Sequence, residues 1–149
     1  MAGVAGALTP DLRPGDIVVA SEILAPDGRV VSCLTDPLVA ALSAAGLRPW
    51  VGRVASVARL RLSREERTRL VAAEAIAVDM ESAWLSQAAT TGLPFVVLRA
   101  ISDTPDRPLW RPVATVLGGI HALRALRKAA PALRSWAGEV SSRRPPGTG

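Results

Sequence analysis

Two short segments of the chain carry the side chains best suited to chemistry. The first is the stretch 77–82, where an apolar run ends in Asp79, Met80 and Glu81 before helix-forming residues begin. The simpler interpretation is that Asp79 and Glu81 cap this helix and favour its positive end. The alternative is a ligand site, because ligands of α/β sheets bind at the carboxyl ends of strands.

The second segment is the stretch 99–103, which ends another apolar run. Arg99 is unusual there, because a buried guanidinium requires an anionic partner, and Asp79 or Glu81 is the natural candidate. Asp103 follows at the strand end, where an isolated aspartate more often serves as a turn or cap residue. We predict that Glu81 and Asp103 lie on adjacent strand ends and face a common hollow.

Strand-forming and helix-forming segments alternate along the chain. We expect strands at 3–7, 16–24, 50–62, 75–78 and 94–101, the last of them apolar on both faces. We expect helices at 34–45, 63–74 and 81–91, and a long one from Val113. This alternation predicts an α/β fold, a three-layer α/β/α sandwich with a mixed, mostly parallel sheet.

Two local signals mark helix boundaries. Ser63 and Glu66 form a capping box, in which each side chain satisfies the other residue's free backbone N–H group. Pro131 lies inside the apolar periodicity of the last helix, so we expect a break or a kink there.

The composition excludes several classes of protein. The chain has 149 residues, of which 49% are hydrophobic, which is enough apolar material for one folded domain. We place this domain at residues 1–140 and a disordered tail at 141–149. Cys33 is the only cysteine and His121 the only histidine, so we expect no disulfide framework, no metal site and no cofactor.

The chain also shows no sign of a membrane or nucleic-acid partner. No apolar run reaches the roughly 18 residues that span a bilayer, and no secretion signal is evident, so a cytoplasmic protein is expected. The net charge is +5, and its excess near the C-terminus could suit a nucleic acid. Five aromatic residues and no tyrosine argue against a base-stacking surface, so a solvated helix face is favoured.

Three motifs, in order, resemble the nucleoside phosphorylase superfamily. They are the glycine-rich stretch 3–8 with LRPGDIVV at 12–19, VDMES at 78–82, and LPFVVLRAISD at 93–103. The likeness covers about residues 3–125. It is closest to the nucleosidase branch, which includes methylthioadenosine/S-adenosylhomocysteine nucleosidase and hopanoid-associated nucleosidase-like proteins. It implies hydrolysis of the N-glycosidic bond of a purine-type nucleoside, by a homo-oligomer.

The resemblance also implies roles for individual residues. Asp103 would be the catalytic acid that protonates the purine at N7, which requires a carboxyl that holds its proton near neutral pH. Glu81 would accept hydrogen bonds from the ribose hydroxyls and favour the positively charged sugar. Met80 would pack against the sugar, and Ser102 would join the substrate-binding residues.

The remaining implied roles concern the approach to the nucleoside. Ala5 and Gly6 would bring the backbone close to the substrate, where larger side chains would obstruct it. Arg99 would orient the acidic pair.

The chain departs from the family pattern in three places. Family members begin with strands that are missing here, which supply the glutamate that activates water. Val4 stands where the nucleosidases have a small hydroxyl residue, and no arginine precedes Arg13, so water is favoured over phosphate as the acceptor. The stretch 54–60 follows the family's Ser-Gly-Asp-aromatic pattern only in part, so no residue is assigned to stack on the base.

These departures leave three functional hypotheses. The leading one is a nucleosidase, with a phosphorylase that uses phosphate as its variant. The second is a catalytically incomplete domain that acts through a partner, and the third is a basic module that associates with nucleic acid. The missing strands also predict that strand 3–7 lacks a neighbour, which would leave an apolar edge that weakens the fold or promotes self-association.

Overall fold

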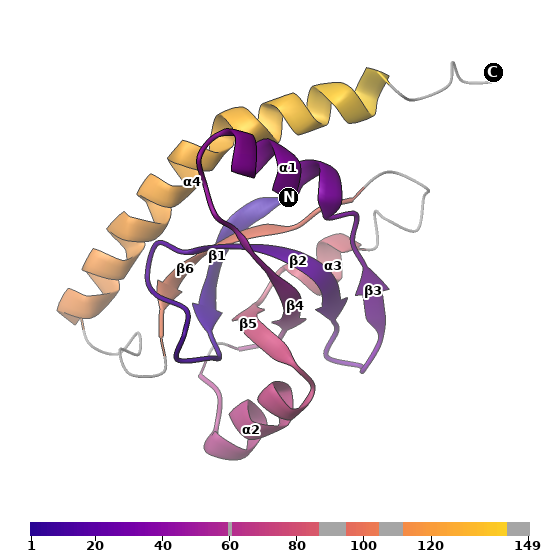
Figure 1. The fold of residues 1–149 in the computed structure, drawn as a ribbon. Coiled ribbons are helices and arrows are strands. Elements are labelled where there is room, and N and C mark those ends of the chain that lie inside the picture. The colour runs from indigo at the N-terminus through magenta and orange to yellow at the C-terminus, as the bar shows by residue number, and fades with distance from the viewer. Residues whose placement is uncertain (60, 87–94, 105–111, 143–149) are drawn as a thin grey trace.

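The computed structural model describes residues 1–59, 61–86, 95–104 and 112–142. These residues form a curved sheet flanked by helices (Figure 1). The strands are β1 (Ala2–Ala7), β2 (Ile17–Leu24), β3 (Val30–Ser32), β4 (Trp50–Ser56), β5 (Ala75–Asp79) and β6 (Leu98–Asp103). The helices are α1 (Asp36–Ala44), α2 (Arg64–Ala72), α3 (Ser82–Leu85) and α4 (Pro112–Ser142).

The sheet is mixed and closes on itself. Its strand order is β3-β2-β4-β5-β1-β6, and β2 also pairs with β6. The parallel pairings are β1–β6, β2–β4 and β4–β5, whereas β1–β5, β2–β3 and β2–β6 are antiparallel. Because β2 joins both β4 and β6, five of these strands form a ring, and β3 lies at its edge.

Small side chains fill the inside of this ring. Side chains alternate between the two faces of a strand, so Val97 and Ile101 lie in the inner cluster whereas Leu98 and Ala100 lie in the outer one. The inner cluster includes Ala5, Ala7, Val18, Ala20, Val54 and Ala77. Arg99 lies two residues from both Val97 and Ile101, so its side chain is on the same, inner face of the strand.

Helices cover the outer face of the ring in two places, one on each side of the molecule. This arrangement of helices around a mixed sheet confirms the α/β sandwich. On one side α1 and α4 pack over a cluster that includes Ile17, Val19 and Leu98. On the other side α2 lies against β5 and contributes Leu70 to a cluster with Val78. The capping box of Ser63 and Glu66 at the start of α2 is confirmed, with hydrogen bonds of 2.7 and 3.1 Å.

Several predicted boundaries differ from the observed ones. The strand predicted at 50–62 ends at Ser56, where its ladder with β5 ends. The strand predicted at 94–101 lies at Leu98–Asp103, because its parallel register with β1 runs from Leu98 to Asp103. Part of the helix predicted at 81–91 is seen as α3, and residues 87–94 lie outside the described residues.

The last helix is longer than predicted. α4 continues through Pro131 to Ser142, so the helix does not break at the proline, and Figure 1 shows that it changes direction along its length. The predicted tail is wrong at its first two positions, Ser141 and Ser142, which are helical. Residues 143–149 lie outside the described residues.

The expected open edge at the first strand is found only in part. β1 lies between β6 and β5, so the prediction that it lacks a neighbour is wrong for Gly6 and Ala7, which pair with β5. Among the described residues, Ala2–Ala5 have strand partners on β6 alone. The physical reason is the curvature of the ring, which brings β5 against only the end of β1.

We expect Gly118→Ala to destabilise the protein and Gly119→Ala not to. A Cβ at Gly118 would overlap the carbonyl oxygen of Ser102, so α4 would have to move away from β6, at a cost of about 1–3 kcal/mol. An added Cβ at Gly119 meets no atom within 4 Å, and alanine favours the helix by about 1 kcal/mol over glycine. Thermal unfolding followed by circular dichroism compares the two variants, and equal stabilities would contradict the packing argument.

Candidate active site

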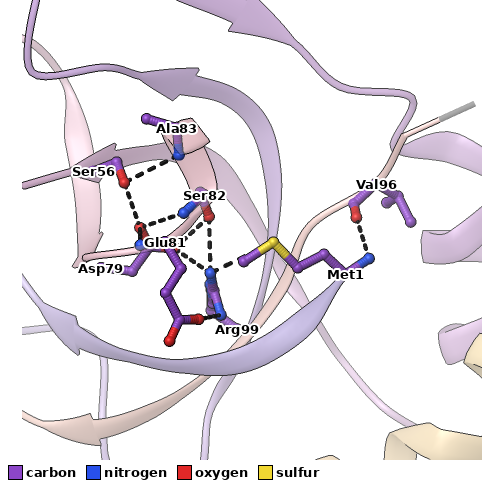
Figure 2. Close-up of polar contacts among 8 residues, drawn as sticks. All are labelled: Met1, Ser56, Asp79, Glu81, Ser82, Ala83, Val96 and Arg99. Atoms are coloured by element: carbon purple, nitrogen blue, oxygen red, sulfur yellow. Dashed lines mark hydrogen bonds and ion pairs between the residues drawn. The ribbon is translucent and has the colours of Figure 1, made fainter. Parts of the chain in front are cut away.

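Arg99 is the centre of a buried polar network (Figure 2). Its side chain is fully buried, and its Nη2 lies 2.6 Å from Asp79 Oδ2 and 3.1 Å from Ser82 Oγ. Its Nη1 lies 3.4 Å from Glu81 Oε2. Both predicted partners of Arg99 are therefore confirmed, and the shorter contact is the buried one. A buried guanidinium without such a partner would be strongly destabilising.

Asp79 serves both as the partner of Arg99 and as the cap of α3. Its Oδ1 accepts hydrogen bonds from the backbone N–H groups of Glu81 and Ser82, at 3.2 and 3.1 Å, and from the hydroxyl of Ser56 at 2.9 Å. The Ser82 hydroxyl also donates to Asp79 Oδ2. The capping interpretation is therefore confirmed for Asp79 and wrong for Glu81, whose side chain makes no cap hydrogen bond. The ligand-site interpretation of this segment stays a prediction.

Ser56 extends the network to a third strand. Its hydroxyl bonds to Asp79 and accepts from the backbone N–H of Ala83 at 3.1 Å. The ends of β4 and β5 and the start of β6 are therefore joined by hydrogen bonds and an ion pair through one carboxylate. Sequence reasoning did not assign Ser56 or Ser82 to the site. Two features of the sequence could have indicated them: Ser82 belongs to the VDMES motif, and Ser56 ends the apolar run of β4.

Glu81 and Met80 lie at the solvent side of this network. The Glu81 side chain is 67% exposed, so most of its hydrogen-bonding capacity is free for a ligand. Met80 is 42% exposed, so its thioether is accessible from the solvent beside Glu81. A fixed carboxylate beside an exposed thioether suits the face of a sugar, which presents hydroxyl groups on one side and C–H groups on the other.

Asp103 is half-buried at the end of β6. Ser102 donates its hydroxyl to Asp103 Oδ1 at 2.9 Å and lies 3.3 Å from the carbonyl oxygen of Ala5. Burial raises the pKa of Asp103 above its ordinary value, against smaller opposing effects of the Ser102 hydrogen bond and the charge of Arg67. A carboxyl group with a raised pKa is the form that can donate a proton closer to neutral pH.

The glycine-rich strand lies directly against these groups. A Cβ at Gly6 would come within 3.0 Å of Asp103 Oδ2, and one at Gly3 would overlap the Arg99 guanidinium. The backbone of β1 therefore approaches Asp103 at Gly6 and Arg99 at Gly3. The side chain of Ala5 lies in the inner core and its carbonyl oxygen faces Ser102, so its approach to a substrate stays a prediction.

Arg67 is a residue of this region that the sequence did not reveal. It belongs to α2, and its Nη1 donates to the carbonyl oxygen of Ala7 at 3.2 Å. Its charge acts on Asp103, although 36 positions separate the two along the chain. No local pattern predicts this, because Arg67 is one of several arginines on a strongly charged helix.

A cavity of about 510 Å³ opens beside Ser56. It lies between α2 and the strand ends of β2 and β4, and its walls are mostly apolar, with Leu24, Val57, Leu62 and Leu70 among them. Neither Glu81 nor Asp103 lines this cavity, so the common hollow between those two residues stays a prediction. The part of the chain that the structure describes contains no group of three or more His, Cys, Asp or Glu side chains arranged to hold a metal ion.

No helix among the described residues is long and apolar enough to cross a membrane.

Comparison with known proteins places these observations in a family. The model of the phosphorylase superfamily matches residues 1–116. The futalosine hydrolase of Streptomyces coelicolor is 31% identical over 157 residues, which cover 91% of this chain and 66% of that protein.

Solved structures show the same fold. The 5′-methylthioadenosine/S-adenosylhomocysteine nucleosidase of Helicobacter pylori superposes with a TM-score of 0.71 at 25% identity, over 92% of this chain and 66% of that one. The futalosine hydrolase of Helicobacter pylori superposes with a TM-score of 0.68 at 25% identity, over 92% and 65%. The chain thus spans just under two thirds of the length of these relatives.

Replacing Arg99 tests the buried network. We expect Arg99→Met to lower the free energy of unfolding by about 3–5 kcal/mol, because it removes the one cation that neutralises the buried charge of Asp79 among the described residues. The matched control is Arg29→Met, since Arg29 pairs with Asp27 at the surface, where water and salt screen an ion pair and it contributes little. Urea unfolding measures both, and similar losses for the two variants would show that the buried pair does not stabilise the ring.

The raised pKa of Asp103 predicts a pH-dependent stability. The folded state binds the proton of Asp103 more tightly than the unfolded chain does. Protonated Asp103 therefore makes its full contribution to the free energy of unfolding below the pKa of the unfolded chain, about 3.9. This contribution is lost as the pH rises through the folded pKa. Asp103→Asn removes this penalty and should melt at a higher temperature than the native chain at pH 7, with a smaller difference at pH 4. A difference that is constant or that grows toward low pH would refute the burial effect.

Proposed function

Because the chain belongs to the phosphorylase superfamily, we propose that it hydrolyses the N-glycosidic bond of a purine-type nucleoside. The observation that carries this proposal is Asp103, a half-buried carboxyl with a raised pKa at a strand end, held by Ser102 against the glycine-rich strand. An acid of this kind is what departure of a purine base requires, since the base leaves with negative charge unless it is protonated.

In the proposed reaction the bond between C1′ of the ribose and the base nitrogen breaks, and its electron pair goes to the base. Asp103 donates its proton to N7 of the base. The water that attacks C1′ passes a proton to the bulk solvent as its oxygen forms the new bond, and Asp103 takes up a proton from the solvent before the next turnover. Glu81 accepts hydrogen bonds from the ribose hydroxyls, and its charge stabilises the positive sugar. Arg99 holds Glu81 in place through the 3.4 Å contact.

Met80 and the backbone at Gly6 complete the proposed sugar site. Met80 is exposed beside Glu81 and offers an apolar surface, and the absence of a side chain at Gly6 leaves room next to Asp103. We place Ser102 there as the residue that orients Asp103. The carbonyl of Ala5, which lies 3.3 Å from Ser102 Oγ, fixes this serine in turn.

Water is the proposed acceptor, with phosphate as the alternative. Val4 is 47% exposed and presents no hydroxyl group to a phosphate ion. The named relatives suggest which nucleosides to test first: futalosine, from the hydrolase of Streptomyces coelicolor, and methylthioadenosine and S-adenosylhomocysteine, from the nucleosidases.

A cytoplasmic location and a homo-oligomer belong to the same proposal. Support for the oligomer comes from large apolar side chains exposed next to the site, namely Met80, Trp84 and Leu85, the last two at 66% and 49% exposure. Contiguous exposed apolar surface commonly marks a protein interface. The second candidate function is a domain that needs a partner for catalysis. It rests on the same exposed surface and on Ala2–Ala5, whose strand partners in the part of the chain that the structure describes lie on β6 alone.

Two substitutions test the assignment of the acid. Asp103→Asn should lower base release by about 10²–10⁴-fold, because it removes the proton donor, while Glu81→Gln should mainly raise KM through weaker sugar binding. Asp11→Asn, at an exposed position beyond β1, is the control and should leave turnover unchanged. Release of base from each nucleoside is followed by chromatography.

Full activity of Asp103→Asn would show that another group is the acid. The second candidate function, a domain that needs a partner, makes a different prediction. The native chain alone would release no base from any of the three nucleosides, and it would do so once a partner is added.

A further inference from the structure

A second cavity lies away from the candidate active site and is strongly basic. It has a volume of about 520 Å³ and is enclosed by three separate parts of the chain: the turn before β2, the segment after α1, and α4. Its floor includes Ile17 and Leu47, and its charged walls carry Arg48, Arg124 and Lys128. A volume of this size suits a small molecule.

The charge of this cavity is not balanced by the protein. None of the ion pairs found among the described residues involves Arg48, Arg124 or Lys128. Asp16 is the only acidic residue of the lining, and its Oδ2 accepts the backbone N–H of Arg13 at 2.8 Å. Among the described residues, three exposed cationic side chains therefore face one carboxylate that is already engaged in a turn.

The positions of these three cations are not explained by compensation of the negative C-terminal end of a helix. Basic side chains often compensate the C-terminal end of a helix, but this effect is confined to the last turn. Arg124 and Lys128 lie in the middle of α4. Arg48 follows α1, whose last free carbonyls already accept the backbone N–H groups of Ala45, Gly46 and Leu47.

The cavity has a wall that is held in place. The turn before β2 is fixed to β6 by two backbone hydrogen bonds, from Gly15 N to Ile101 O at 2.8 Å and from Ile101 N to Asp16 O at 2.9 Å. Arg124 and Lys128 are four residues apart and so lie on the same face of α4. Two of the three cationic groups are therefore presented by one helix, opposite a turn that is held in place, which lowers the entropic cost of gathering them around an anion.

We propose that this cavity binds a small phosphate-bearing anion. Arginine and lysine are the side chains that recognise phosphate groups, the first by paired hydrogen bonds and the second as a point charge. A nucleic acid is the less suitable occupant, because no Phe, Tyr or Trp side chain lines the cavity and His121 is its only ring, which leaves little surface for bases to stack on. This site is independent of Asp103 and of the proposed hydrolysis.

Calorimetric titration with inorganic diphosphate tests the proposal. We expect saturable binding at one site per chain, weakened at least about 10-fold in a variant that combines Arg124→Gln with Lys128→Gln. The matched control combines Arg127→Gln with Arg134→Gln, which removes the same charge from exposed positions of the same helix outside the cavity lining. It should change the affinity less than about 3-fold, since only long-range attraction is lost.

Three results would overturn the proposal. They are the absence of saturable diphosphate binding, an equal loss of affinity in the two paired variants, and tighter binding of a short DNA duplex that both pairs weaken alike. The last two would show a diffuse basic helix face rather than a site. All four substituted side chains are exposed, so far-UV circular dichroism should confirm that both variants fold.

Discussion

The ion pair between Arg99 and Asp79 is the constraint on which the rest of the structure depends. A guanidinium with no exposed surface sits inside a ring of alanine and valine side chains, where an unpaired charge would be intolerable. Asp79 neutralises it and at the same time binds Ser56, Ser82 and the first backbone N–H groups of the turn into α3. One carboxylate thereby fixes the relative positions of β4, β5 and β6 and directs Glu81 to the outside.

Small residues make this arrangement possible. The ring closes because β2 pairs with both β4 and β6, and half of the buried residues in its inner cluster are alanines, the rest being valine, isoleucine and leucine. Glycine then allows two close approaches: of Arg99 to β1 at Gly3, and of the Asp103 carboxyl to β1 at Gly6. Larger side chains at these positions would push apart the strands that carry the charged groups.

The two acidic positions of the candidate site lie in different surroundings. Glu81 is mostly exposed and contacts a guanidinium, whereas Asp103 is half-buried, accepts a hydrogen bond from a hydroxyl group, and has a raised pKa. A carboxylate kept near a cation suits the binding of hydroxyl groups, and a carboxyl that retains its proton suits donation to a leaving group. This difference is set by the protein surroundings, since the two residue types alone are chemically alike.

Local patterns in the sequence predicted the alternation of strands and helices, the capping box at Ser63 and the pairing of Arg99 with Asp79 and Glu81, because each depends on residue type and near neighbours. Burial of an arginine in an apolar strand is itself a local signal that an anion must lie close. The tertiary structure alone decided the closure of the ring, the end of β4 at Ser56, and the continuation of α4 through Pro131. It also decided the contact of Arg67 with Ala7, 60 residues away, and the basic cavity that three distant segments enclose. Such contacts arise from strand register and curvature, which a periodicity of two or of 3.6 residues does not encode.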